Sequence, residues 1–287
     1  MSNEIVRIDS AVTLEALNRS EIDVQISTAK QYPRVISQSL DRIKQIATVN
    51  QEVAAECFYA LPRGGKTLEG PSVRLAEIVA TSWGNLRVQA QIIGNDGRMI
   101  TARGICHDLE TNVAFSSEVR RRITDSNGRT YNEDMQIVTG NAASAIALRN
   151  AIFKCVPKAI LATVAGEIKK TAIGGAGDDI DSRRAKAIAF FGKQGVTEDM
   201  ILFFLEVGSV EEIGPEELFR LTAVRNAVNE NSTTYQQALI APYNESKKAK
   251  AGAKKMTAAQ SRVAEAMKGN TKEVEVETDG DMPIFEM

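Results

Sequence analysis

The sequence Gly64–Thr67 is the pattern in this chain that lies nearest to nucleotide chemistry. A P-loop reads GxxxxGK[ST], and Gly-Lys-Thr matches its end, but Ala60 stands where the first glycine is required. A P-loop also leaves a strand and runs directly into a helix, so that the helix N-terminus meets the phosphates. Here residues 52–60 have a helical pattern, and Gly70 precedes the next helix start. The sequence therefore disfavours an ATPase, which stays an alternative, and we expect no cofactor.

Other catalytic groupings have little support. His107 is the only histidine, and we expect it on a strand, packed or facing solvent. The three cysteines are widely spaced without a CxxC pair, which is typical of reduced thiols rather than of a zinc site. Asp108, Glu110 and Glu118 lack the DxD spacing of a two-metal site. We expect no catalytic residues and no metal.

Basic side chains are the more informative signal. Residues 61–170 contain 15 lysines and arginines against 10 acids, although the whole chain has a net charge of −2. On a strand, Arg120 and Arg122 share one face with Glu118, and Arg87 together with Arg98 or Arg103 comes from adjoining strands. A ribbon of guanidinium groups suits backbone phosphates, whereas the alternative is an ordinary solvated edge. We interpret this region as a surface for a polyanion, single-stranded nucleic acid above all.

Aromatic residues, on which bases stack, are scarce, and this favours a binder that grips the backbone regardless of sequence. Tyr131, in a basic loop, is the best candidate for stacking, while Phe115 and Trp83 are expected in the core. The residues predicted to contact DNA are Arg63, Lys66, Arg74, Arg87, Arg98, Arg103, Arg120, Arg122, Arg129, Tyr131, Arg149, Lys154 and Lys158.

The C-terminal residues 271–287 have the opposite charge, with one lysine against six acids. Their acids precede an apolar cluster, and the residues predicted to bind a partner are Asp279, Asp281, Met282, Pro283, Ile284 and Phe285. This tip resembles the C-terminal end of bacterial single-strand DNA-binding protein, except that Glu286-Met287 follow the phenylalanine. We expect it to recruit a replication or recombination protein with a basic, apolar pocket, or to fold back onto the basic groove; a solubilising end is the alternative.

The elements that must position these residues are those of an α+β fold. Two helices are expected in 22–60, with Pro33 near the start of the first, and another after Pro71. Strands are expected at 86–92, 98–108 and 112–124, then a short strand or loop at 129–138 and helices at 142–156, capped by Asn141, and 158–170.

The predicted organisation places a helix-flanked antiparallel sheet of three to four strands in the core. The segments are a flexible arm at 1–20, the DNA-binding core at 21–172, a linker at 173–181, a small helical module at 182–243, and a disordered tether with an acidic tip at 244–287. No run of ~18 apolar residues and no secretory signal is visible, so we expect a cytoplasmic protein.

Residues 65–85 (GKTLEGPSVRLAEIVATSWGN), the three strands and residues 147–159 (ALRNAIFKCVPKA) resemble phage single-strand annealing proteins of the RecT, Red-beta and Erf groups. Residues 191–213 resemble, more weakly, a C-terminal module of such proteins. The resemblance implies ATP-independent annealing of complementary DNA strands in phage recombination, in the bacterial cytoplasm, and assembly into homo-oligomeric rings or filaments. It also implies that Arg149, Lys154 and Lys158 face the DNA. A single-strand binder without annealing activity and a P-loop enzyme remain alternatives.

Overall fold

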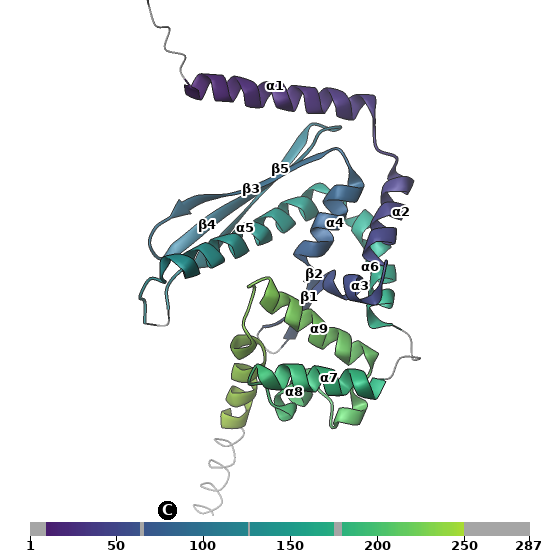
Figure 1. Cartoon of the computed structure of the whole chain (residues 1–287), viewed down its shortest axis with the longest axis vertical. Coiled ribbons are helices and arrows are strands. Elements are labelled where there is room, and N and C mark those ends of the chain that lie inside the picture. Colours follow the sequence, from purple (N-terminus) through teal and green to yellow (C-terminus); the bar gives the residue numbers. More distant parts are fainter. Residues whose placement is uncertain (1–9, 64–65, 126, 175–179, 250–287) are drawn as a thin grey trace, which may run out of the picture. The chain divides into compact units, whose positions relative to one another are not determined.

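The computed structural model describes residues 10–63, 66–125, 127–174 and 180–249, with side chains from Asn18 onward except at Arg63 and Lys66. The chain divides into two compact units, Met1–Ile240 and Ala241–Met287. Within the first unit, helices flank two small antiparallel sheets, so the α+β class predicted from the sequence is confirmed (Figure 1).

The larger sheet has three strands in the order β3–β4–β5, which are Leu86–Asn95, Met99–Asp108 and Val113–Arg122. All neighbours are antiparallel, as the alternating apolar pattern predicted. The turn between β3 and β4 follows its Asn-Asp-Gly sequence: Asp96 Oδ1 accepts hydrogen bonds from the N–H groups of Arg98 and Met99, and Gly97 has a φ of 80°.

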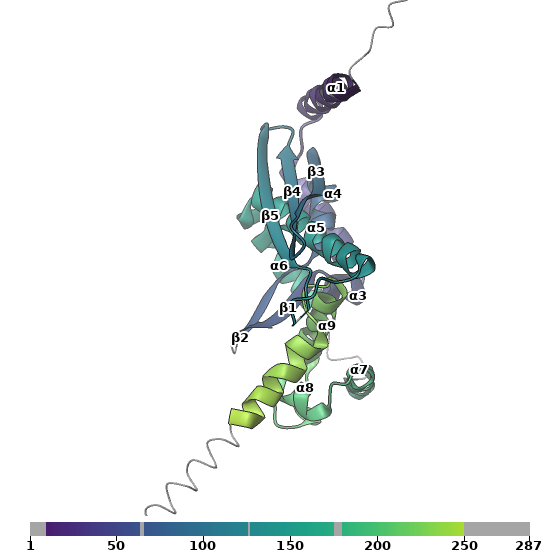
Figure 2. The same cartoon turned by 90° about the vertical axis from the view of Figure 1, so that its left-hand side faces the viewer.

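Helix α5, Glu133–Cys155, lies along one face of this sheet (Figure 2). The contact is close because small residues meet: Ala102 of β4 and Ala143 and Ala147 of α5 are fully buried. A Cβ on Gly104 would overlap the backbone carbonyl of Ala147. Only glycine therefore lets the helix approach this strand without a shift.

The predicted start of this helix at Asn141 is wrong. The side chain of Asn132 caps it by accepting the N–H of Met135 at 2.9 Å, and acids at Glu133 and Asp134 favour the first turn. The segment 129–138, predicted as strand or loop, is thus mostly helical. Gly140 lies inside α5, although glycine disfavours a helix interior, and its Cα is close to the side chain of Ile100.

A second, two-stranded sheet was not predicted. Strands β1, Phe58–Arg63, and β2, Lys66–Pro71, pair along their whole length, where the sequence suggested a helix end and a loop. The preceding helix α3 is short, Gln51–Glu56, and is capped by Asn50. The hairpin depends on a distant partner, because Phe58 packs edge-to-face on Phe219 of α9 with ring centroids 5.5 Å apart.

The remaining helices of the core are α1, Ser10–Gln31, α2, Ile36–Ala47, α4, Val73–Trp83, and α6, Lys158–Ile173. Residues 10–20, predicted as a loose arm, belong to α1. Pro33 lies in the break between α1 and α2, three residues before the first residue of α2, so its predicted place near a helix start is confirmed. Ser72 caps α4, since its Oγ accepts the N–H of Leu75.

The C-terminal helices of the first unit are α7, Ile180–Lys193, α8, Glu198–Leu205, and α9, Pro215–Asn229, with short turns of helix at Val210–Glu212 and Gln236–Ile240. They are packed on the core rather than set apart as a separate module. Asn226 Nδ2 donates to the carbonyls of Ala55 and Phe58 at 2.8 and 2.9 Å, and Phe219 belongs to the main apolar cluster. In the second unit residues 241–249 are helical, which includes the start of the predicted tether.

Arg34, directly after Pro33, joins the start of α2 to the β4–β5 turn. Its guanidinium makes two hydrogen bonds of 2.7 Å to Asp108 and one of 2.9 Å to Glu110, and it lies 4.9 Å from the ring centroid of Trp83. The side chains of Arg34 and Asp108 are each only 9% exposed. Burial alone would raise the pKa of Asp108, but the bonds and charge of Arg34 keep that pKa below its usual value.

Arg34→Ala should reduce the free energy of unfolding by about 3–5 kcal/mol, because it leaves the buried Asp108 carboxylate without its partner. Urea unfolding followed by circular dichroism measures this change. The matched control is Lys44→Ala, which removes an exposed ion pair with Glu167 and should cost only about 0–1 kcal/mol. Equal losses for the two variants would contradict the role given to Arg34.

Gly104→Ala should destabilise the protein by about 1–3 kcal/mol, since the added methyl group forces α5 away from β4. Gly166→Ala is the control, and its effect on stability should be opposite. Nothing lies within 4 Å of its Cβ position in α6, so the substitution should stabilise the protein by roughly 0.5–1 kcal/mol. Thermal unfolding of both variants checks the pair, and a neutral Gly104→Ala would refute the close contact.

Candidate nucleic-acid interface

The face of the three-stranded sheet opposite α5 carries much of the predicted cationic ribbon. Along β4, even-numbered residues such as Ala102 and Cys106 are buried under α5, and the odd-numbered residues between them are half-buried. We call the other side the open sheet face; it comprises Arg87, Gln89, Gln91, Gly94, Met99, Thr101, Arg103, Ile105, His107, Ala114, Ser116, Glu118, Arg120 and Arg122.

The strand register brings three arginines into consecutive rows. Arg122 lies opposite Met99, Arg120 opposite Thr101, and Arg103 opposite Glu118. Arg87 is farther along the sheet, opposite His107. Of the two arginines that the sequence left open, Arg103 is on this face, whereas Arg98 is exposed in the β3–β4 turn.

Each of three arginines on the open sheet face has an acidic partner at the surface. Arg103 pairs with Glu118 at 2.8 Å, and Arg120 pairs with Asp96 at 3.2 Å. Their side chains are 42% and 61% exposed, so these pairs contribute little to stability and can exchange for another anion.

The third pair fastens α1 to the sheet: Arg87 contacts Glu21 at 3.1 Å and Gln25 at 3.0 Å. Arg122 has no ion pair with any residue in the described part of the chain. The sequence placed Glu118 on the same face as Arg120 and Arg122, whereas Asp96 and Glu21 were not singled out as partners.

Two further predicted cations lie near the rim of the sheet. Lys154, in the last turn of α5, donates to the carbonyl of Ser116 at 3.2 Å. Arg129 is exposed in the loop after β5, where its N–H donates to Asp125. Lys158 is exposed at the start of α6.

Arg149 and Arg74 lie away from the open sheet face. The guanidinium of Arg149 is 4.8 Å from the ring centroid of Tyr59 and 3.9 Å from Glu230, and its side chain is only 12% exposed. It therefore helps to hold α5, β1 and the end of α9 together. Arg74 pairs with Glu77 on α4 at 3.0 Å.

The three aromatic residues considered in the sequence differ in their exposure. Tyr131 is partly buried and packs against the cluster that contains Ile100 and Ile123. Phe115, expected in the core, is 39% exposed. Trp83 is buried as expected.

Several predicted residues cannot be placed with their side chains. Arg63 and Lys66 face each other across the end of the β1–β2 hairpin, and only their backbone is described. The tail residues from Asp279 to Phe285 lie outside the described residues.

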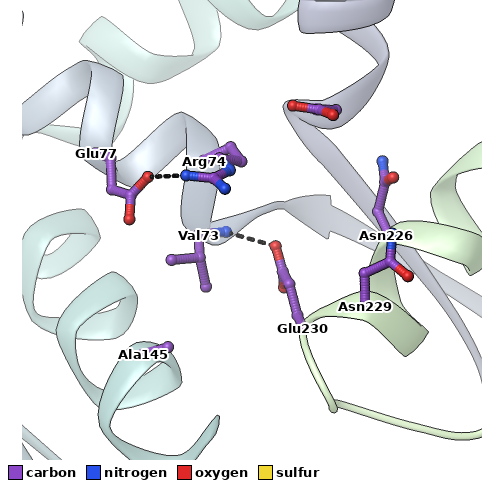
Figure 3. A pocket seen from close by; sticks show the side chains of 8 residues that line it. Val73, Arg74, Glu77, Ala145, Asn226, Asn229 and Glu230 are labelled. Atoms are coloured by element: carbon purple, nitrogen blue, oxygen red, sulfur yellow. Dashed lines mark hydrogen bonds and ion pairs between the residues drawn. The ribbon is translucent and has the colours of Figure 1, made fainter. Parts of the chain in front are cut away.

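A cavity of about 260 Å³ lies between α4, α5 and α9 (Figure 3). Glu230 Oε1 accepts the N–H of Val73 there at 2.9 Å and so caps α4 from a distant part of the chain. Burial raises the pKa of Glu230, opposed by that N–H and by the charge of Arg149. Asn226, which lines the same cavity, bonds to the core, so we assign these groups to joining α9 with α4.

Within the described ranges no group of three histidine, cysteine or acidic side chains is placed to hold a metal ion. No helix there is long and apolar enough to cross a membrane. Comparison of the chain with models of protein families, with curated proteins and with solved structures gives no match.

Proposed function

We propose that this protein binds single-stranded DNA on the open sheet face and promotes ATP-independent annealing of complementary strands. The observation that carries the proposal is the group of Arg103, Arg120 and Arg122 in consecutive rows of an uncovered sheet. Guanidinium groups bind phosphate through paired hydrogen bonds. The present partners of Arg103 and Arg120 are carboxylates in exposed ion pairs, which are weak.

The spacing of the arginines suits a strand held by its backbone. Residues two apart on one face of a strand are separated by roughly 6.8 Å, so Arg120 and Arg122 can contact different phosphates. The polar neighbours Gln89, Gln91 and Ser116 can add hydrogen bonds without an aromatic platform that would bury the bases. A strand gripped in this way keeps its base edges free for a complementary strand, which is the requirement for annealing.

A nucleotide-driven reaction has less support in the fold. Arg63 ends β1 and Lys66 begins the antiparallel strand β2, so Lys66 and Thr67 lie on a strand and not directly before a helix. The helix N-terminus that a P-loop offers to phosphates is therefore missing from this position. A single-strand binder without annealing activity is the second candidate, because the same arginines would serve it.

Arg120→Ala with Arg122→Ala should weaken binding to single strands of every sequence alike. The slope of log affinity against log salt concentration should become less steep by about 0.7 for each phosphate that is no longer neutralised. Fluorescence anisotropy with labelled homopolymer and mixed-sequence oligonucleotides at several salt concentrations measures both effects. Arg42→Ala with Lys193→Ala removes two exposed cations away from the sheet and should change neither. Undiminished binding by the first variant would remove the open sheet face from the proposal.

Annealing of complementary oligonucleotides should proceed in EDTA without nucleotide, and Lys66→Ala should not abolish it. The reason is that strand pairing is itself favourable and needs only charge neutralisation and alignment. A fluorescence-quenching assay follows the reaction. A requirement for ATP and magnesium, lost in Lys66→Ala, would instead support the nucleotide-dependent enzyme, and tight binding without annealing would support the second candidate.

A further inference from the structure

Helices α7 and α9, both green in Figure 1, line a groove on the C-terminal part of the first unit. Its cavity of about 380 Å³ lies within the range of ~300–1,000 Å³ typical of pockets that hold small ligands. The floor is apolar, formed by Phe191, Leu218 and Leu221. Phe190 stands at its edge, 36% exposed and perpendicular to Phe191, with ring centroids 5.3 Å apart.

Three cationic side chains, Arg183, Lys186 and Arg225, also line this groove, and none of its lining residues is acidic. The guanidinium of Arg225 lies 5.9 Å from the ring centroid of Phe190. Its Nε is buried and has no hydrogen-bond partner among the described residues. A second cavity of about 260 Å³ is also lined by Arg183 and Arg225, so these two residues contribute to both cavities.

A buried N–H without an acceptor is costly, and an apolar floor ringed by cations is suited to a ligand that carries both acids and apolar side chains. This chain contains such a sequence. Its C-terminal residues 273–287 hold six acids, of which Asp279 and Asp281 directly precede Met282, Ile284 and Phe285.

We propose that the groove between α7 and α9 is a peptide-binding site, and that its occupant is the acidic C-terminal segment 273–287 of this chain. Ile284 and Phe285 would enter the apolar floor, and Asp279 and Asp281 would bind the cations at the rim. The inference does not depend on the proposed function of the open sheet face. It assigns the tail a site other than the DNA-binding surface.

Nucleic acid fits this groove less well than a peptide does. A strand of DNA presents a regular series of phosphates, whereas the three cations here surround one compact apolar floor. Of the two aromatic residues that line the groove, Phe191 is buried, so a base could stack only on Phe190 at the edge. A short acidic peptide with an apolar end satisfies both the floor and the rim.

The test uses the full chain carrying Ile284→Ala and Phe285→Ala, so that its own tail does not compete, and a fluorescent peptide of residues 273–287 as the probe. The peptide should bind to this protein and bind more weakly to the wild-type chain. Adding Lys186→Glu should weaken binding roughly fivefold or more, as expected when a charge pair becomes a repulsion. Lys193 is exposed on the same helix but does not line the groove. Lys193→Glu makes the same change of charge and should leave the affinity within about twofold of the value without it.

Specificity is checked with a peptide that itself carries Ile284→Ala and Phe285→Ala, which should lose most of its affinity. Thermal unfolding confirms that Lys186→Glu is folded, as its exposed position leads us to expect. Three results would overturn the proposal: no peptide binding, equal weakening by Lys186→Glu and Lys193→Glu, or weakening by Arg120→Ala with Arg122→Ala instead, which would place the tail on the open sheet face. Loss of single-stranded DNA binding in Lys186→Glu would likewise identify the groove as a nucleic-acid site.

Discussion

The close contact of α5 with β4 at Gly104 is the constraint on which the rest of the structure depends. Because a single long helix covers one face of a three-stranded sheet, the opposite face remains open for a ligand. The same helix brings Arg149 to Tyr59 and Glu230, and so links the sheet to the β1–β2 hairpin and to α9. Residues with larger side chains at Gly104 or Ala147 would separate these layers.

Burial divides the arginines into two groups with different tasks. Arg34 and Arg149 are nearly enclosed, and Arg34 is bonded to two carboxylates, so their charges are committed to the fold. Arg103 and Arg120 have single acidic partners at the surface, where water and salt screen the attraction. Only the second group can give its hydrogen bonds to phosphate without leaving a buried carboxylate uncompensated.

The sequence predicted the three strands of the larger sheet well, because alternation with period two and turn residues such as Asn95-Asp96-Gly97 are local signals. It failed at the β1–β2 hairpin, whose stability comes from Phe219 and Asn226, more than 150 residues farther along the chain. The open sheet face followed from alternation, but the inward position of Arg149 did not, since one helix presents cations on several sides. The groove of α7 and α9 was missed because Arg225 comes from a helix that is distant in sequence from Arg183 and Lys186.

The two basic surfaces of this chain differ in what they can distinguish. On the open sheet face the arginines are arranged in rows, and a repeating polyanion can engage several of them in turn. In the groove Arg225 lies beside Phe190, and leucine side chains line the same site. A ligand that is only charged would therefore leave the apolar part of the site without contacts. A ligand that lacks apolar side chains therefore gains little there, and one that lacks a regular series of charges gains little on the sheet. Under the two proposals, the groove would hold the acidic segment 273–287, and the open sheet face would be left to single-stranded DNA.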